Sequence, residues 1–250
     1  MFRPLAWSAV IILTCAGVGA AEVPEDARLQ SLFTGFLQET FRREPTTATQ
    51  LGEHAYDDRL DDVSPEARRS NLEFQKATLD RLDREIDLAK LTPAGRVDLD
   101  IFRRSLEASI WLRETFDPFR EDPRVYGDYV TNSVYLLLTQ STLPKEVNRR
   151  NALRRIQEAP RILEVARRTI GRAPRVKVET AIRQAEGAVA FYKNDLFLLA
   201  GDKPGEGDLA EAAAKLAGDL ESYVEFLRSD VLPRSTEEWR IGREKFVKKL

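Results

Sequence analysis

The only histidine of the chain, His54, lies beside Glu53 and three residues before Asp57. A histidine next to carboxylates can hold a metal ion or act as a general base near neutral pH. The alternative is a loop histidine that hydrogen-bonds across a helix junction, and the sequence favours it. His54, Tyr56 and Asp57 are our candidate cleft or signature residues, and no residue is assigned to catalysis, cofactor binding or a metal.

An acidic cluster surrounds this histidine, and its composition is like that of calcium-binding loops. Its members are Glu53, Asp57, Asp58, Asp61 and Asp62. Calcium loops alternate their acidic ligands, turn at a glycine and close with a glutamate. That order is missing, so the cluster is predicted to be a solvated acidic surface.

The residue inventory excludes several kinds of site. The 250 residues include one His, one Cys and one Met. A zinc site built from histidines, a C-x-x-C redox pair and an internal disulfide are therefore excluded within this chain. The sequence also lacks a G-x-S-x-G elbow, a phosphate loop and a dinucleotide fingerprint. We expect no cofactor to be held by this chain alone.

The stretch from Lys145 to Lys177 is strongly basic, with 11 Lys and Arg residues against three Glu, a net charge of +8. Such a stretch can bind phosphates. It contains no aromatic residue on which bases could stack. We therefore expect no nucleic-acid partner, and predict that these cations pair with acidic faces of neighbouring helices or with an acidic segment beyond Leu250.

The elements that position these residues are predicted to be helices, because apolar residues recur at helical spacing and no alternating run is bounded by hairpin turns. Ser64-Pro65 and Thr92-Pro93 are predicted to start helices. In each pair the hydroxyl can cap a free backbone N–H, and the proline that follows has no N–H that would need a partner. The fold class is all-α, a multi-helix array of antiparallel helices. The predicted helices span Asp26–Arg43, Pro65 through Ile86, Pro93 to before Phe116, Val130–Leu138, Lys145–Glu158, Arg161–Ile170, Val178 to Gly201, Asp208 to before Pro233, and Ser235 onward.

Three details of this prediction concern packing. Leu37 belongs to the predicted buried stripe of the first helix. Pro160 is predicted to separate two helices. The segment Ser235–Glu238 has the pattern of a capping box, and the helix after it is predicted to bury Trp239, Ile241 and Phe246. This helix is still amphipathic at Leu250, so we expect the sequence to be truncated there.

The first residues have the pattern of a secretory signal peptide, with Arg3 before an uncharged run from Leu5 to Ala20. Cleavage after Ala20 is preferred and after Ala21 is the second choice. A membrane anchor and a lipidated Cys15 are less favoured alternatives. We therefore predict a signal peptide at 1–20, a helical region at 21–250, no membrane span after cleavage, and a periplasmic or secreted protein.

The segment Pro45–Asp57, which contains Leu51-Gly52-Glu53-His54, resembles a signature near the mature start of the DUF885 family of secreted or lipid-anchored bacterial proteins. Further segments occur in the family's order. They are Arg96–Ile101, Asp122-Pro123 with Tyr126, Glu179–Ile182 with Gln184, and Arg240–Glu244 with Leu250. The resemblance covers essentially the whole region 21–250.

This resemblance implies the N-terminal half of a larger, all-helical fold like that of zinc metallopeptidases. In the family an H-E-x-x-P-G-H motif lies beyond the point that corresponds to Leu250, so zinc is expected only in that C-terminal half. Two histidines one turn apart hold such a zinc while the glutamate activates its water. With His54 the only histidine, this motif is missing here. We expect a helical portion of a periplasmic hydrolase that is inactive alone, with a peptide as substrate of the intact protein. The alternative is a non-catalytic secreted helical binding or scaffold protein.

Overall fold

The computed structural model describes residues 24–249, so the predicted signal peptide at 1–20 and Cys15 lie outside the described residues. Within the described part the chain is helical, and its one β-type contact is an isolated parallel bridge between Pro174 and Thr236. The all-α prediction is confirmed. No helix in this part of the chain is long and apolar enough to cross a membrane.

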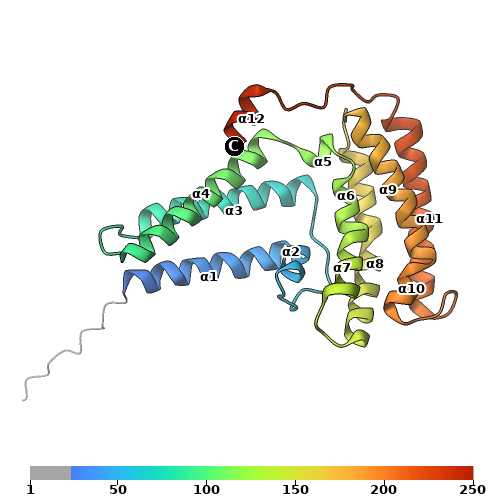
Figure 1. Cartoon of the computed structure of the whole chain (residues 1–250), viewed down its shortest axis with the longest axis horizontal. Coiled ribbons are helices and arrows are strands. Elements are labelled where there is room, and N and C mark those ends of the chain that lie inside the picture. The colour runs from blue at the N-terminus through green and yellow to red at the C-terminus, as the bar shows by residue number, and fades with distance from the viewer. Residues whose placement is uncertain (1–23, 250) are drawn as a thin grey trace, which may run out of the picture.

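The helices form two lobes that lie side by side (Figure 1). The N-terminal lobe consists of α1 (Glu25–Arg43), α3 (Pro65–Glu85) and α4 (Pro93–Thr115). The C-terminal lobe consists of α6 (Val125–Gly127), α7 (Ser133–Gln140), α8 (Lys145–Thr169), α9 (Arg175–Lys193), α10 (Asp195–Ala200), α11 (Gly207–Phe226) and two π-helical turns, η1 (Asp128–Asn132) and η2 (Leu227–Val231). Short α5 (Pro118–Glu121) leads from α4 into the second lobe.

Each lobe has its own hydrophobic core. In the N-terminal lobe the buried residues are Leu29, Leu32, Leu82, Leu91, Leu99 and Leu106, and Phe36 stacks on Phe74 with ring centroids 5.3 Å apart. The second core is larger and brings α8, α9 and α11 together. Leu60 and Val63 also belong to it. The segment that we call the junction, α2 (Pro45–Gln50) with the loop 51–63, is therefore anchored in the C-terminal lobe.

The predicted helix starts of the N-terminal lobe are confirmed in detail. Ser64 Oγ accepts a hydrogen bond from the Ala67 N–H at 3.2 Å, and Thr92 Oγ1 accepts one from the Gly95 N–H at 3.1 Å. Asp26 of α1 in turn accepts from the Thr92 N–H at 3.0 Å. A Cβ at Gly95 would lie 2.6 Å from the Asp26 carboxylate, so a larger residue at position 95 would displace this side chain from its hydrogen bond with Thr92.

Several predicted boundaries and faces are wrong. Pro160 lies inside α8, which runs on to Thr169, because apolar contacts on both sides of the proline hold the helix together. The helix predicted from Val178 to Gly201 breaks at Asn194 into α9 and α10. Leu37 of α1 is predicted to be buried, but its exposed fraction is 45%.

The prediction of a capping box at Ser235 is also wrong. Ser235 Oγ donates to the Leu232 carbonyl, and the Thr236 N–H and carbonyl bond to Ala173 and Arg175, so this segment is held in an extended path. The last described helix, α12, begins only at Arg243 and ends at Lys249. It lies beside the end of α4 (Figure 1), and Trp239, Ile241 and Phe246 are exposed instead of buried.

Replacing the proline inside α8 measures how much this residue lowers the free energy of unfolding. Pro160→Ala is expected to raise the free energy of unfolding by about 1–3 kcal/mol, since it restores an N–H for the Ile156 carbonyl and removes a ring clash. Urea unfolding followed by circular dichroism measures this change. Pro93→Ala, at the first residue of α4, is the matched control and is expected to have little effect. A destabilised Pro160→Ala variant would mean that packing of the ring outweighs the lost hydrogen bond.

Candidate functional site

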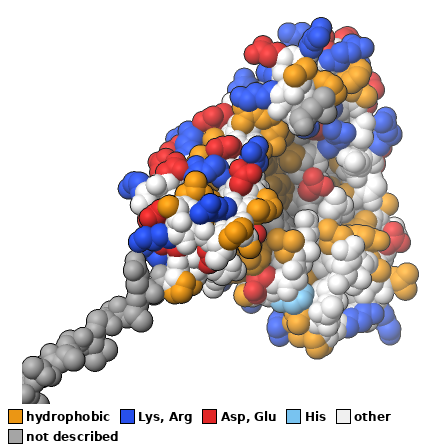
Figure 2. Space-filling view, turned by 60° about the vertical axis from the view of Figure 1, so that its left-hand side comes forward, with side chains coloured by type: hydrophobic (Ala, Val, Ile, Leu, Met, Phe, Trp, Pro, Cys, Tyr) orange, Lys and Arg blue, Asp and Glu red, His pale blue; other side chains and the backbone are white. Residues whose placement is uncertain are grey.

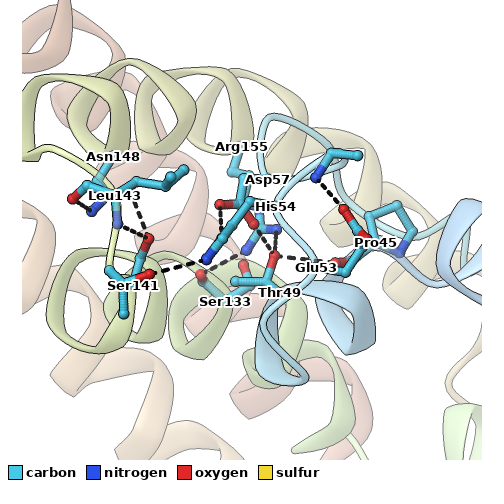
Figure 3. A network of polar contacts seen from close by, with 12 residues as sticks. Pro45, Thr49, Glu53, His54, Asp57, Ser133, Ser141, Leu143, Asn148 and Arg155 are labelled. Carbon is cyan, nitrogen blue, oxygen red and sulfur yellow. Dashed lines mark hydrogen bonds and ion pairs between the residues drawn. The ribbon is translucent and has the colours of Figure 1, made fainter.

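The junction is organised by a buried arginine of α8. Arg155 is completely buried, and its Nη1 donates to the Ser133 carbonyl at 2.9 Å while Nη2 donates to Thr49 Oγ1 at 2.5 Å (Figure 3). Burial lowers the pKa of Arg155, and the nearby carboxylates of Asp57 and Asp61 oppose this by favouring the charged form. Arg155 thus connects α8 with α2 and with the start of α7.

The countercharge of Arg155 is reached through a hydroxyl. Thr49 Oγ1 lies 2.6 Å from Asp57 Oδ1, and Asp57 is 1% exposed. Because the Thr49 hydroxyl accepts from the guanidinium, its proton is free to be donated to the carboxylate. Arg155, Thr49 and Asp57 therefore form a buried charge pair bridged by a neutral group.

His54 completes this network at the surface. Its Nδ1 lies 2.8 Å from Asp57 Oδ2 (Figure 3). Thr142 Oγ1 lies 3.5 Å from its Nε2. With Asp57 ionised, Nδ1–H is the donor and Nε2 is left as an acceptor. The predicted hydrogen bond of His54 across a helix junction is present, since Asp57 lies in the loop and Thr142 lies between α7 and α8.

The other acidic residues of the cluster divide into two kinds. Asp58 is exposed, with only a long ion pair to Arg59, and Asp62 is exposed. Asp57 and Asp61 are buried, so the predicted solvated surface is wrong for these two. The structure brings His54 and Asp57 together, while the Tyr56 ring lies under the Arg59 guanidinium, with 5.8 Å from the guanidinium carbon to the ring centroid. Among residues 24–249, no group of three or more His, Cys, Asp or Glu residues is placed to hold a metal ion.

Asp61 lies on the side of the junction that faces the N-terminal lobe. Its Oδ1 accepts from both the N–H and the hydroxyl of Thr46 at 2.9 Å. Burial raises the pKa of Asp61 to about 6, although the hydrogen bonds from Thr46 favour the charged form. The carboxyl of Asp61 can therefore take up and release a proton near neutral pH.

A hollow of about 510 Å³ lies next to Asp61, between the two lobes (Figure 2). Its walls come from Glu44 and the junction, from α3, α4 and α5, and from η1 and α7. They include Glu44, Gln50, Asp61, Arg68, Arg113, Asp128, Tyr129 and Asn132. Arg113 donates to Glu44 at 2.9 Å and Arg68 to Asp117 at 2.7 Å, so ion pairs between segments fix both cations. The Arg68 Nε is buried without a hydrogen-bond partner.

The hollow combines the features of a binding site for a polar ligand. Its volume falls within the range of about 300–1,000 Å³ that is typical of ligand pockets. Burial raises the pKa of Tyr129, which keeps its hydroxyl neutral and able to donate a hydrogen bond. Carboxylates, guanidinium groups and a neutral phenol thus converge on one space, where they can bind both donors and acceptors of a peptide-like ligand.

The segment 45–63 that shapes this hollow is the start of a recognised family region. The model of a family described as "Bacterial protein of unknown function (DUF885)" matches residues 45–250. The chain belongs to the DUF885 family. The match begins at Pro45, the first residue of α2, and the predicted resemblance is confirmed.

A solved structure shares this fold. It is described as "a putative lipoprotein of unknown function" from Shewanella oneidensis, with a TM-score of 0.76 and 21% sequence identity. The similar part covers 88% of this chain and 41% of that chain, so this sequence spans less than half the length of the Shewanella chain. At this identity the likeness establishes the fold alone. No curated protein matches the chain.

Two central residues of the site were not singled out in the sequence. Arg155 is one of 11 basic residues in the stretch 145–177, and Asp61 is one of five residues in the predicted acidic surface. The available signal for Arg155 was its position on the apolar face of its helix, between Ala152 and Ala159, because a cation on a buried face needs partners. Other cations of this stretch also pair within the chain, as Arg149 does with Asp202 at 2.6 Å.

Removing the countercharge is expected to destabilise the fold. In Asp57→Asn the buried guanidinium of Arg155 loses its nearest charge partner, which should lower the free energy of unfolding by about 3 kcal/mol. The exposed neighbour provides the control, since Asp58→Asn should change it by less than about 0.5 kcal/mol. Adding Arg155→Met to Asp57→Asn is expected to recover part of the loss. If urea unfolding gives Asp57→Asn and Asp58→Asn the same free energy of unfolding, the buried charge pair of Asp57 and Arg155 is contradicted.

The raised pKa of Asp61 predicts a stability that depends on pH. Between pH 4 and pH 6 the folded state holds this proton and the unfolded state has lost it, so the contribution of Asp61 to stability falls as pH rises. A pKa about two above the ordinary value corresponds to about 3 kcal/mol. The difference in unfolding free energy between wild type and Asp61→Asn should therefore decrease by up to that amount from pH 4 to pH 7. A flat or rising difference would show that the pKa is not raised.

Proposed function

We propose that this DUF885 region forms the substrate-binding wall of a periplasmic hydrolase that acts on peptides. The observation that carries the proposal is the hollow between the lobes, where Asp61, Arg68 and Tyr129 converge beside the family's first matched segment. Paired donors and acceptors suit the alternating N–H and C=O groups of an extended peptide. The reaction class comes from the resemblance to zinc metallopeptidase-like proteins.

The residues of this chain do not fit the zinc site of such a hydrolase. The sequence has one histidine, and its ring is engaged with the buried Asp57 carboxylate. A catalytic zinc needs about three protein ligands with one open position. We therefore propose that any zinc ligands belong to the part of the longer relatives that this sequence does not cover, and that the 250-residue chain is inactive by itself.

The proposed hydrolase is also assigned a place in the cell. Residues 1–20 are proposed to be a signal peptide that directs the chain to the periplasm, and the description of the Shewanella neighbour as a lipoprotein supports a place outside the cytoplasm. Cleavage after Ala20 and lipidation of Cys15 give mature proteins of different mass. Intact mass spectrometry of the protein released from the cell envelope distinguishes them, and an uncleaved chain would contradict the proposal.

A non-catalytic binding or scaffold protein is the second candidate. The observation that favours it is the exposed apolar face of α4, where Val97 is 58% and Ile101 is 61% exposed. These side chains lie outside both hydrophobic cores and fit a macromolecular contact better than a small ligand.

Peptide binding tests the first proposal against the second. The purified chain is expected to bind short peptides, measured with a set of pentapeptides by saturation-transfer NMR. Gln50→Trp should weaken this binding at least about tenfold, because Gln50 is an exposed residue of the hollow's lining and a bulky ring there blocks the space. Leu51→Trp is the matched control on the adjacent exposed residue, which does not line the hollow, and should bind like wild type.

Two outcomes would contradict the peptide proposal. One is a folded wild-type chain that binds none of the peptides at millimolar concentration, which would favour the scaffold. The other is equal binding by the two tryptophan variants. A separate measurement tests the proposal that this chain holds no zinc ligands. The purified chain is dialysed against zinc and its metal content is measured, and stoichiometric zinc would overturn that proposal.

A further inference from the structure

The hollow between the lobes carries an excess of negative charge. Its lining includes four carboxylates and two guanidinium groups. Arg113 is engaged by Glu44, and Arg68 pairs with Asp117, which lies outside the lining. Within the described part of the chain, the other carboxylates of the lining form no salt bridge, and they are Asp61, Asp62 and Asp128. A cation is therefore the ligand group that balances the charge of this space.

Asp61 is the most buried of these three carboxylates, with 6% of its surface exposed, whereas Asp62 and Asp128 are exposed. Its two oxygens have different surroundings. Oδ1 accepts both hydrogen bonds from Thr46, one from the backbone N–H and one from the hydroxyl. Oδ2 accepts no hydrogen bond from any residue in 24–249. Asp61 thus keeps one carboxylate oxygen for a ligand.

This free oxygen of Asp61 is open to the hollow. Among the described residues, three buried side-chain atoms are both inaccessible to solvent and without a hydrogen-bond partner, and they are Arg68 Nε, Arg155 Nε and the Tyr223 hydroxyl. Asp61 Oδ2 also lacks a partner but is not one of these inaccessible atoms, so it keeps accessible surface. Because Asp61 lines the hollow, a ligand atom in that space can contact Oδ2.

Further acceptors line the same space. Asn132 Nδ2 donates to Asp128 Oδ1 at 2.7 Å, which leaves the Asn132 amide oxygen as an acceptor. Both residues belong to η1, so acceptors reach the hollow from this turn as well as from the junction. A primary ammonium has three N–H donors and no acceptor, which suits such a space. A metal ion fits less well, since no group of three or more His, Cys, Asp or Glu residues in 24–249 is placed to hold one.

The groups around Asp61 determine the pH at which this site is charged. They are Glu44, Arg68 of α3, Arg113 of α4, Asp128 and Tyr129 of η1, and Arg155 and Arg161 of α8. Burial raises the pKa of Asp61 to about 6, with Glu44 acting in the same direction and Arg155 against it. Tyr129 stays neutral, because burial raises the pKa of its hydroxyl. Asp61 is therefore mostly ionised at pH 7 and mostly protonated at pH 5.

We propose that Asp61 binds a primary ammonium group of the ligand in the hollow, and that the exposed carboxylates of Asp62 and Asp128 attract this group. The ammonium belongs either to the free N-terminus of a peptide or to a lysine-like side chain, and the chemistry is the same in both. The inference rests on the proposed function, since it names the charge that the hollow selects in a peptide. A small amine tests the same site without a peptide.

Matched peptides measure the contribution of the ammonium. Gly-Gly-Ala-Gly-Gly amide with a free N-terminus is compared with the same peptide acetylated at its N-terminus, by NMR titration of the full chain at pH 7. Wild type is expected to bind the free form at least about tenfold more tightly, because acetylation removes a charge-assisted hydrogen bond. N-acetyl-Gly-Gly-Lys-Gly-Gly amide identifies the source. If it binds more tightly than the free N-terminus, the group is a lysine-like side chain, and the reverse order assigns the N-terminus.

Asp61→Asn isolates the carboxylate. The asparagine keeps an oxygen for the hydrogen bonds from Thr46 and removes the charge, so the preference for free amines is expected to disappear. Asp58→Asn is the matched control, since it removes the same charge from an exposed residue of the same loop that does not line the hollow. This control should keep the preference of wild type. Thermal unfolding of both variants shows that they are folded.

A pH series on wild type tests Asp61 without a variant. n-Butylamine stays protonated from pH 5 to pH 7, because alkylammonium groups have a pKa of about 10. Its affinity is expected to fall about tenfold from pH 7 to pH 5, as Asp61 takes up a proton. n-Butanol, which carries no charge, should show no such fall. If Asp61→Asn fails to fold, this series still decides the question.

The outcomes separate this inference from the proposed function. Equal binding of the free and acetylated peptides by wild type overturns the ammonium site and leaves peptide binding intact. Binding of n-butylamine that falls with pH, without binding of any peptide, supports the ammonium site and overturns the peptide proposal. A preference for amines that survives in Asp61→Asn, or an affinity for n-butylamine that is the same at pH 5 and pH 7, overturns the assignment to Asp61. If neither the peptides nor n-butylamine bind at millimolar concentration, both proposals are wrong.

Discussion

The arrangement of this molecule depends on placing one positive charge, the guanidinium of Arg155, inside a helical core. A cation removed from water costs several kcal/mol unless hydrogen bonds and a countercharge replace the solvent. α2 supplies the Thr49 hydroxyl, the loop after it supplies Asp57, and the start of α7 supplies a carbonyl. The junction therefore folds onto α8 instead of extending α1. Its opposite side, with Asp61, then faces the hollow.

Local signals made much of the fold predictable. Ser64 and Thr92 bond to N–H groups three residues away, so the starts of α3 and α4 depend on neighbours in the sequence. The continuity of α8 through Pro160 and the extended path after Ser235 depend on packing against residues far along the chain, which no short pattern contains. The family resemblance includes most of the junction, residues 45–57. It did not show that Arg155, about a hundred residues later, is the group around which the junction folds.

The π turn η1 illustrates how one local irregularity serves several sites. Two backbone carbonyls of this turn accept hydrogen bonds from side chains. Ser133 Oγ donates to the Tyr129 carbonyl, and the Tyr192 hydroxyl donates to the Val130 carbonyl. On one side the turn borders the hollow between the lobes, and on the other it borders a cavity of about 360 Å³ within the C-terminal lobe, whose other walls come from α6, α9 and α11. A regular helix at this position would change the walls of both spaces at once.

The path of the chain between the lobes has a consequence for the energetics of binding. The backbone passes from one lobe to the other before α2, after the junction, between α4 and α5, and again after η2, where Lys245 and Lys248 of α12 lie over Phe116 and Trp111. The first three crossings tie the lobes together covalently, and α12 adds non-covalent contacts at the fourth, so the lobes have little freedom to rotate about a single hinge. The hollow is thus preorganised, and a ligand that enters it loses little free energy to ordering of the protein. Affinity in this region should then depend on complementarity with fixed groups more than on closure around the ligand.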